Sequence, residues 1–233
     1  ARATALRGSF KHETRPHAPP LRGSLPPKGG RRRLGAARRR LAVGLAMNWR
    51  SVSLASVPPQ PWKNGGGTTR ELLAWPAGAD WRVRLSVAEV VADGPFSRFE
   101  GVQRWFAVLR GAGVRLVVDG VAHTVTATDG PLAFGGAADT CCTLLGGPTQ
   151  DFNLMLRGGS ARVQRVQGQL QVAPSASQFL AVYTGNEMAS VVLGAEAAVF
   201  PPHTLLWRDV SATHPLPPIT LDAPGALWME ISP

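Results

Sequence analysis

Cysteine is scarce in this sequence of 233 residues, since only Cys141 and Cys142 are present and they are adjacent. Neighbouring side chains on a strand point to opposite faces, so a disulfide between these two is disfavoured, and with it a disulfide-stapled fold. The pair also lacks the spacing of a cysteine-ligated metal site. Reduced cysteines fit a cytoplasmic location, which is the one we expect.

Other signals of known function are missing as well. No apolar run approaches the ~18–20 residues of a transmembrane helix, so no membrane partner is expected. Outside the first 46 residues the histidines form no His-x-His or His-x-x-x-His pair, and no carboxylate stands at a matching offset. The sequence therefore predicts no metal and no cofactor. There is also no Gly-x-Ser-x-Gly motif, and neither cysteine has a neighbouring histidine to activate it.

Acidic residues are nearly absent from residues 1–46, which contain 12 Lys+Arg and the single acid Glu13. Residues 47–233 contain 13 Lys+Arg and 14 Asp+Glu, so the net charge of +10 belongs to the first segment. That segment is dominated by Arg, Ala, Gly and Pro and cannot bury a core, so we expect a disordered tail. The nearly neutral remainder excludes a basic globular domain that acts through its overall charge.

Three interpretations of the tail compete. It is a basic arm that contacts nucleic acid through Arg31–Arg33 and Arg38–Arg40, a targeting peptide, or translated sequence upstream of a true start at Met47. The four dominant residue types all have G/C-rich codons, which favours the third interpretation. A nucleic-acid partner is accordingly disfavoured.

Helical periodicity is scarce after residue 46, whereas short apolar or alternating runs recur with Gly, Pro and Asp between them. Asp119-Gly120 lies between Val114–Val118 and Val121–Val125, which is a strong two-residue hairpin signal. Many short strands separated by tight turns predict an all-β fold. A break near residues 157–159 suggests two stacked β-barrel or jelly-roll halves, with one large sandwich as the alternative.

Residues 61–71 form the first of four segments that could carry chemistry. Three consecutive glycines at 65–67 allow a ligand to approach the backbone, and successive N–H groups can form an anion-binding nest. Lys63 and Asn64 would add a charge and an amide. The alternative is a plain glycine-rich turn. The spacing does not match a nucleotide phosphate loop.

The second segment is an alternating strand over Val83–Val91. Arg84 and Ser86 share one face of this strand, while apolar residues occupy the other. If the strand lines a barrel, both side chains point into the lumen, where a guanidinium holds a carboxylate. The alternative is an ordinary half-buried strand with Arg84 in water.

The third and fourth segments are Asp93–Phe99 and Asp151–Met155. The third predicts a turn anchored by two phenylalanines, with Ser97 as a candidate donor to a ligand. In the fourth, Asp151 and Asn153 share one strand face, which points either to solvent or into a ligand cavity.

Together these segments resemble the HutD/Ves family of bacterial bicupins, and the resemblance extends over residues 47–233. Glu100 is a departure, because the family usually has proline there; this changes loop stiffness rather than the pocket. Some residues belong to the family motifs but are not expected to bind the ligand. They are Trp62, Gly65, Gly66, Gly67, Thr69, Asp93, Phe96, Phe99, Arg104, Asp151 and Phe152.

The resemblance implies a double cupin of two stacked jelly-roll β-barrels, over residues 47–158 and 159–233, without the usual metal-binding histidines. The family is linked to histidine utilisation, and one branch is described as stress-induced. Its members resemble binders or sensors of a small anionic metabolite such as urocanate or an N-formyl or formimino glutamate. The ligand-binding residues implied for this chain are Lys63, Asn64, Arg84, Ser86, Ser97 and Asn153. Within this set, Arg84 and Lys63 would hold a carboxylate, and the others would orient the ligand.

A binding protein that modulates histidine utilisation is therefore expected, rather than an enzyme. The first alternative is a small-acid hydrolase or isomerase on the same scaffold, in which Lys63 acts as acid or base if burial lowers its pKa. The second is a nucleic-acid-associated regulator that uses the basic tail. A homodimer is left open.

Overall fold

The structure, a computed structural model, describes residues 42–43, 49–173, 179–210 and 216–233. Within them the regular secondary structure is β-strand except for a single turn of 3-10 helix, η1, at Leu54–Ser56. This confirms the predicted all-β class. No helix in this part of the chain is long and apolar enough to cross a membrane.

Most of the predicted tail, residues 1–46, lies outside the described residues. The exception is Ala42–Val43, which forms β1 and pairs in parallel with β17 (Glu196–Phe200). The interpretations of Met47 as a start and of the arginine runs as nucleic-acid contacts also concern residues outside the description.

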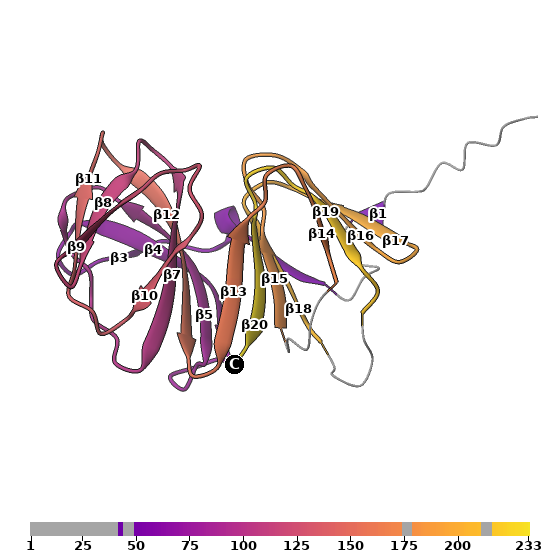
Figure 1. The fold of residues 1–233 in the computed structure, drawn as a ribbon, viewed down its shortest axis with the longest axis horizontal. Helices are drawn as coiled ribbons and strands as arrows, with labels where there is room; N and C mark the ends of the chain where they lie inside the picture. Colours follow the sequence, from indigo (N-terminus) through magenta and orange to yellow (C-terminus); the bar gives the residue numbers. More distant parts are fainter. Residues whose placement is uncertain (1–41, 44–48, 174–178, 211–215) are drawn as a thin grey trace, which may run out of the picture. The chain divides into compact units, whose positions relative to one another are not determined.

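Two sheets build the first half of the fold, and their strand pairs are antiparallel (Figure 1). The larger sheet has six strands in the spatial order β10 (Leu132–Gly135), β7 (Val102–Arg110), β12 (Thr149–Arg157), β5 (Val83–Val90), β4 (Gly67–Trp75) and β3 (Gln60–Pro61). The smaller sheet has the order β6 (Gly94–Pro95), β11 (Thr140–Leu144), β8 (Val114–Val118) and β9 (Val121–Val125).

Two five-stranded sheets build the second half. One has the order β13 (Ser160–Arg165), β20 (Leu227–Ser232), β15 (Phe179–Tyr183), β18 (Thr204–Asp209) and β2 (Arg50–Ser53). The other has the order β1, β17, β16 (Ala189–Leu193), β19 (Ile219–Asp222) and β14 (Gln169–Val172). Because β2 pairs with β18, the chain contributes a strand to the second half before it enters the first.

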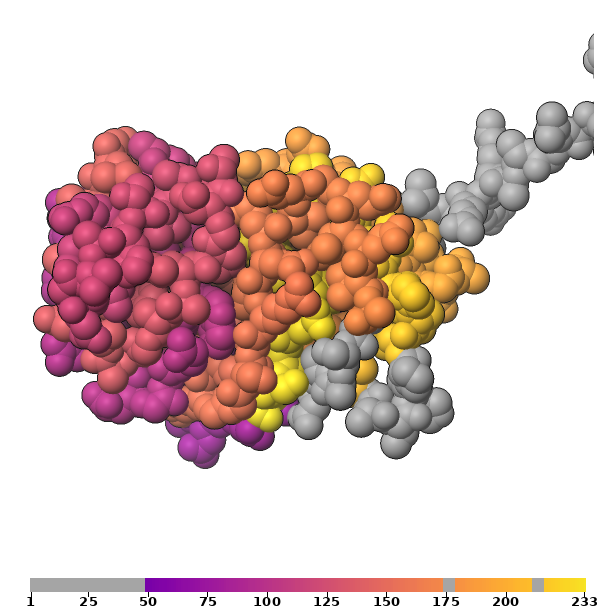
Figure 2. Space-filling view, in the orientation of Figure 1, coloured from indigo at the N-terminus to yellow at the C-terminus, as the bar shows by residue number. Residues whose placement is uncertain are grey.

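Strand alternation explains how the halves meet. Val83, Leu85 and Val87 on β5 are fully buried and pack against Phe179 and Met229 from the second half. The side chains between them on β5 point the opposite way, into the first half. The space-filling view shows the two sets of strands in direct contact, the first in magenta to salmon and the second in orange to yellow (Figure 2).

The predicted hairpin is confirmed. Val118 pairs with Val121 across a two-residue turn, so β8 and β9 are antiparallel neighbours. Asp119 and Gly120 both have positive φ angles, 46° and 82°, which is the backbone of a type I′ turn.

The interiors of the two halves differ. In the second half a cluster that includes Trp49, Leu180 and Trp228 fills the space between its sheets with apolar side chains. In the first half the apolar cluster around Phe106 and Leu116 leaves a large cavity beside it, lined by both polar and apolar side chains. The arrangement confirms the predicted jelly-roll architecture and puts the candidate site in the first half.

Candidate ligand-binding site

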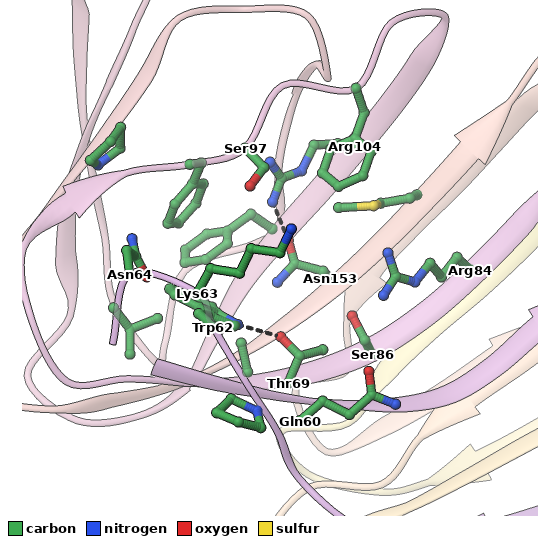
Figure 3. Close-up of a pocket in the computed structure, with 18 residues that line it drawn as sticks. Gln60, Trp62, Lys63, Asn64, Thr69, Arg84, Ser86, Ser97, Arg104 and Asn153 are labelled. Atoms are coloured by element: carbon green, nitrogen blue, oxygen red, sulfur yellow. Dashed lines mark hydrogen bonds between the residues drawn. The ribbon is translucent and has the colours of Figure 1, made fainter. Parts of the chain in front are cut away.

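A cavity of about 640 Å³ lies inside the first half, against the six-stranded sheet (Figure 3). Its walls come from β5, β7 and β12, from the turn between β3 and β4, and from the segment after β6. All six residues that were predicted to bind a ligand line it: Lys63, Asn64, Arg84, Ser86, Ser97 and Asn153.

Strand alternation explains why separate segments converge here. Ser86 on β5 pairs in register with Asn153 on β12, and Asn153 pairs in turn with Phe106 on β7. In register, side chains of neighbouring strands share a face, so three strands present one continuous wall. Ser86 and Asn153 are 5% and 6% exposed and form the deep part of the cavity, whereas Lys63 and Ser97 are exposed at its rim.

Arg104 is the deepest cation in the cavity, although it was predicted only as a motif residue. Its side chain is 5% exposed, and its Nη2 donates a hydrogen bond to Oδ1 of Asn153 at 2.8 Å. The guanidinium carbon lies 5.1 Å from the ring centroids of both Phe96 and Phe134, so aromatic faces hold the charge on two sides.

No carboxylate among the described residues lies within ion-pair distance of Arg104. Its Nε is buried without a hydrogen-bond partner. Burial, with a smaller contribution from the nearby charge of Arg84, lowers the pKa of Arg104 from 12.5 to about 10. The group is still charged at neutral pH, and a buried charge without a counter-ion favours an anionic ligand.

Arg84 differs from Arg104 because it has an internal partner. Its Nε lies 2.6 Å from Oε2 of Glu71 on the neighbouring strand, and the two side chains are 22% and 37% exposed. The other N–H donors of the Arg84 guanidinium are available to a ligand, because the side chain lines the cavity. Part of the Arg84 charge is therefore neutralised by the protein itself, which leaves Arg104 as the stronger candidate for holding a carboxylate.

Of the two interpretations of glycines 65–67, an anion-binding nest and a plain turn, the structure contains the turn. The N–H of Gly65 donates to the carbonyl of Trp62, and the N–H of Gly66 donates to Oδ1 of Asn64. None of the glycines lines the cavity. The segment is a turn whose amides are used internally, and Lys63 on this turn lines the cavity at its rim (Figure 3).

Gly67 has a packing role instead. A Cβ atom built there would collide with the carbonyl oxygen of Glu89 and would lie 3.2 Å from the ring of Trp62. The indole N–H of Trp62 donates to Oγ1 of Thr69 at 2.8 Å, which fixes the ring at the cavity wall. A glycine is therefore needed where β4 begins, so that Trp62 can lie flat beside it.

These residues fall inside a region that matches a known family. The sequence profile of the HutD family, described as HutD, matches residues 54–225. The chain belongs to the HutD family. The predicted family resemblance is thus confirmed.

Relatives of this HutD-family chain agree with the fold. An uncharacterised 21.2 kDa protein in the hutC 3′ region of Pseudomonas putida is 37% identical over 145 residues, which covers 60% of this chain and 75% of that protein. Protein Ves of Escherichia fergusonii is 33% identical over 114 residues, or 48% and 59% of the two chains. The solved structure of HutD from Pseudomonas fluorescens matches with a TM-score of 0.68 and 30% identity, over 79% of this chain and 98% of that one.

The cupin assignment rests on fold likeness. A cupin barrel protein from Leptotrichia buccalis superposes with a TM-score of 0.50 at 7% identity, over 82% of this chain and 99% of that chain. An identity this low shows the fold alone. The predicted double-cupin fold is confirmed in this sense. No three His, Cys, Asp or Glu side chains of the described part of the chain come together as a metal site.

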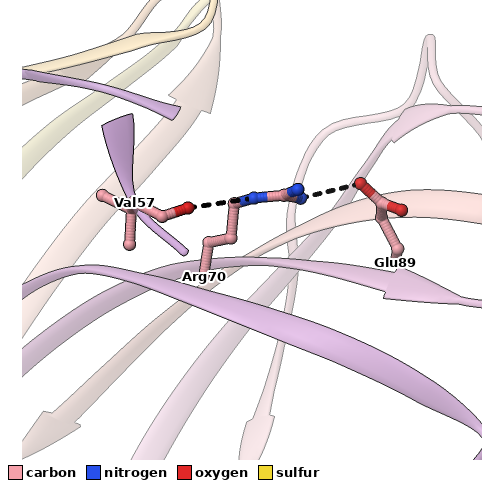
Figure 4. A network of polar contacts seen from close by, with 3 residues as sticks. All are labelled: Val57, Arg70 and Glu89. Atoms are coloured by element: carbon pink, nitrogen blue, oxygen red, sulfur yellow. Dashed lines mark hydrogen bonds and ion pairs between the residues drawn. The ribbon is translucent and has the colours of Figure 1, made fainter. Parts of the chain in front are cut away.

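Arg70, on β4, fixes the segment that leads into the cavity wall. Its Nε donates to the carbonyl of Val57 at 3.1 Å, and its Nη1 lies 2.8 Å from Oε1 of Glu89 (Figure 4). Val57 follows η1 and precedes Gln60, the first residue of the cavity wall. Arg70 therefore ties this segment to β4 and β5 without entering the cavity.

The other motif residues support the wall or the core. Phe96 and Phe99 line the cavity, and Phe152 packs in the interface between the halves. Asp93 accepts a hydrogen bond at Oδ1 from the N–H of Leu144 at 2.8 Å, which joins the turn before β6 to the end of β11. These contacts explain why the motif extends beyond the cavity lining.

Asp151 shares a strand face with Asn153 but does not line the cavity. It is fully buried, with one oxygen accepting from the Thr149 hydroxyl at 2.7 Å and the other, Oδ1, without a partner. Burial raises the pKa of Asp151 to about 7, although the Thr149 hydrogen bond acts against the shift. The predicted placement on the face of Asn153 is confirmed, but the side chain belongs to the core.

A sequence signal for Arg104 did exist. Arg104 lies on the same face of β7 as Val102, Phe106 and Val108, and all four side chains are buried. β7 begins at Val102, so Arg104 lies inside the strand. An arginine within an alternating series of apolar residues is the sequence pattern that indicates a buried cation such as Arg104.

Proposed function

We propose that this protein binds a small carboxylate in the first-half cavity and thereby modulates histidine utilisation. One observation carries the proposal: among the described residues that line the cavity, Lys63, Arg84 and Arg104 are cations, and none is Asp or Glu. A concave site with a few convergent polar groups and unbalanced positive charge is suited to a small anion.

The size and the distribution of polar groups favour a ligand with a carboxylate and a flat or polar second end. Arg104, Ser86 and Asn153 form a buried polar end, while Lys63 supplies a cation at the rim. Phe96 adds an apolar wall between them. The cavity volume lies within the roughly 300–1,000 Å³ of small-molecule sites. Urocanate and the N-formyl or formimino glutamates have this combination of groups.

The link to histidine utilisation rests on the names of relatives. One solved relative carries the name HutD, and one curated relative lies in a hutC 3′ region. We extend that association to this chain. The proposal includes a cytoplasmic location, which is supported by the two free thiols at Cys141 and Cys142.

Binding is favoured over catalysis by the chemistry of the lining. In the described part of the chain it includes no histidine, cysteine, aspartate or glutamate, which are the usual groups for proton transfer and nucleophilic attack. Lys63, the candidate acid or base of the hydrolase alternative, is exposed, so the burial on which that role depends is missing.

The test is a ligand panel on the full chain. Urocanate, N-formyl-L-glutamate and formimino-L-glutamate would be titrated while the melting temperature is followed, with the neutral amides of the same acids as controls. Saturable stabilisation by an acid but not by its amide is expected. NMR spectra of the ligand, recorded over hours, should stay unchanged. If no acid raises the melting temperature, the proposal is wrong; if the ligand is converted, the enzyme alternative holds.

A further inference from the structure

A second cavity lies where the two halves meet. It has a volume of about 160 Å³ and shares no lining residue with the first cavity. Leu109 and Ala127 of the first half line one side. The other side comes from Arg165 and Tyr183 and from the turns that precede β16, β18 and β20. The first of these turns contributes one carboxylate, that of Glu187, whose side chain is exposed.

Two arginines cross between the halves at this place. Arg165 on β13 donates to the carbonyls of Val108 and Asp129 in the first half, both at 2.8 Å, and to that of Gly225 at 3.1 Å. These hydrogen-bond partners are all neutral carbonyls, and the Asp129 carboxylate adds a longer-range electrostatic attraction to Arg165. A guanidinium carries five N–H donors, so two donors of Arg165 remain unused by these contacts.

Arg110, at the end of β7, reaches in the opposite direction. Its Nε donates to Oδ1 of Asn186 at 3.0 Å, and its Nη2 lies 2.7 Å from Nε2 of His203. Because a guanidinium only donates, Nε2 accepts and the proton of the neutral imidazole is on Nδ1. No carboxylate of the described residues lies within ion-pair distance of Arg110 or Arg165.

Tyr183 contributes an unsatisfied donor to the same cavity. It is 1% exposed, its ring packs on Phe152 at 5.2 Å between centroids, and it lines the cavity. Its hydroxyl is buried and has no hydrogen-bond partner. Burial raises the pKa of the phenol and keeps it a donor, while the charges of Arg110 and Arg70 act against that rise. The buried hydroxyl of Tyr183 and the spare N–H donors of Arg165 therefore face one cavity without an acceptor for the hydroxyl.

We propose that this second cavity binds a small oxyanion, such as inorganic phosphate or a carboxylate no larger than acetate. The volume holds more than one water, whose share of the liquid is about 30 Å³, but is below the roughly 300 Å³ of sites for larger ligands. An oxyanion offers only acceptors, which matches the Tyr183 hydroxyl and the spare donors of Arg165. Because both halves line the cavity, the bound anion stabilises their contact.

The test uses the full chain with Arg104→Met, which removes the anchor of the first site. Inorganic phosphate, and in a second arm acetate, is titrated by calorimetry at ionic strength held constant with sodium chloride. Saturable binding is expected, weakened about tenfold by adding Tyr183→Phe, which keeps the ring and removes only the hydroxyl. The arm with the tighter binding identifies the class of oxyanion. Equal affinity with and without the hydroxyl, or no saturation by about 10 mM, overturns the proposal.

A soak with selenate gives a readout that does not depend on stability. Crystals of the full chain should show an anomalous selenium peak within hydrogen-bond distance of the Tyr183 hydroxyl, and Arg165→Gln should abolish it. A peak in the first cavity alone overturns this second site but leaves the proposed function intact, so failures of the two proposals are distinguishable.

Discussion

Arg104 donates a hydrogen bond from Nη2 to Oδ1 of Asn153 at 2.8 Å. Among the described residues, this amide is the only hydrogen-bond partner of the guanidinium. The relationship joins β7 to β12 at the deep end of the cavity. It orients the guanidinium but does not neutralise it, because an amide oxygen carries no net charge. The uncompensated charge of Arg104 should therefore have measurable effects on binding and stability.

Replacing Arg104 by Met should weaken binding of the small carboxylate by about ten- to a hundredfold, because one charge-assisted hydrogen bond contributes roughly 1.5–3 kcal/mol. The melting temperature should be unchanged or higher, since the variant removes a desolvated charge and keeps an apolar side chain beside Phe96 and Phe134. Calorimetric titration and thermal unfolding check the two parts. Arg98→Gln, which removes an arginine of a surface ion pair, is the control and should bind normally.

Asn153→Asp should abolish carboxylate binding in a protein that still folds. The new carboxylate would sit where Oδ1 now accepts from Arg104, so the protein would supply its own counter-ion. Competition between internal and external anions is the physical reason. Retained binding in a folded variant, judged by circular dichroism and titration, would contradict an anion site at Arg104.

Glu71→Gln should tighten carboxylate binding by about two- to fivefold, because it removes the acid that neutralises part of the Arg84 charge. The expected gain is small, since the pair is partly exposed and screened by solvent. Glu89→Gln is the matched control, because Glu89 pairs with Arg70 outside the cavity lining. Equal effects of the two variants would mean that only the overall charge matters.

Asp151→Asn should remove a pH dependence of stability. The folded pKa of Asp151 is raised to about 7 from 3.8, so the unfolded chain ionises first as the pH rises. Stability from this group is complete below about pH 4 and is lost as the pH rises to about 7. The loss is of the order of 4 kcal/mol, since one pKa unit is about 1.4 kcal/mol. Denaturant melts at pH 4 and pH 8 should show the wild type losing more stability than the Asn variant; parallel losses would refute the assignment.

Gly67→Ala should destabilise the fold by about 1–3 kcal/mol, because the added Cβ meets the Glu89 carbonyl and the Trp62 ring. Gly130→Ala is the matched control, since a Cβ there has nothing within 4 Å and the φ angle is not in the left-handed region. Chemical denaturation of the two variants gives the comparison. Equal stabilities would show that Trp62 can move aside without cost.

The strands and their faces could be predicted from the sequence because alternation has a direct physical meaning. The face shared by Arg84 and Ser86 is the one that lines the cavity, and the Asp119-Gly120 turn forms the expected hairpin. The pairing of Glu71 with Arg84, 13 residues apart in the chain, could not be predicted, because it depends on the register between β4 and β5.

The glycines at 65–67 show a second limit of sequence patterns. A run of glycines is compatible both with a nest that binds an anion and with a turn that uses its own amides. The choice depends on Asn64, whose side-chain oxygen takes the Gly66 N–H, and on Trp62, whose carbonyl takes the Gly65 N–H. Such local competition is decided by geometry that residue types alone do not specify.

The most direct test of the central claim is a crystal structure of the full chain with N-formyl-L-glutamate, and in parallel with urocanate. The expected result is ligand density in the first cavity, with a carboxylate oxygen about 3 Å from the Arg104 guanidinium. Density at another site only, or a first cavity that holds solvent alone at saturating ligand, would contradict the account.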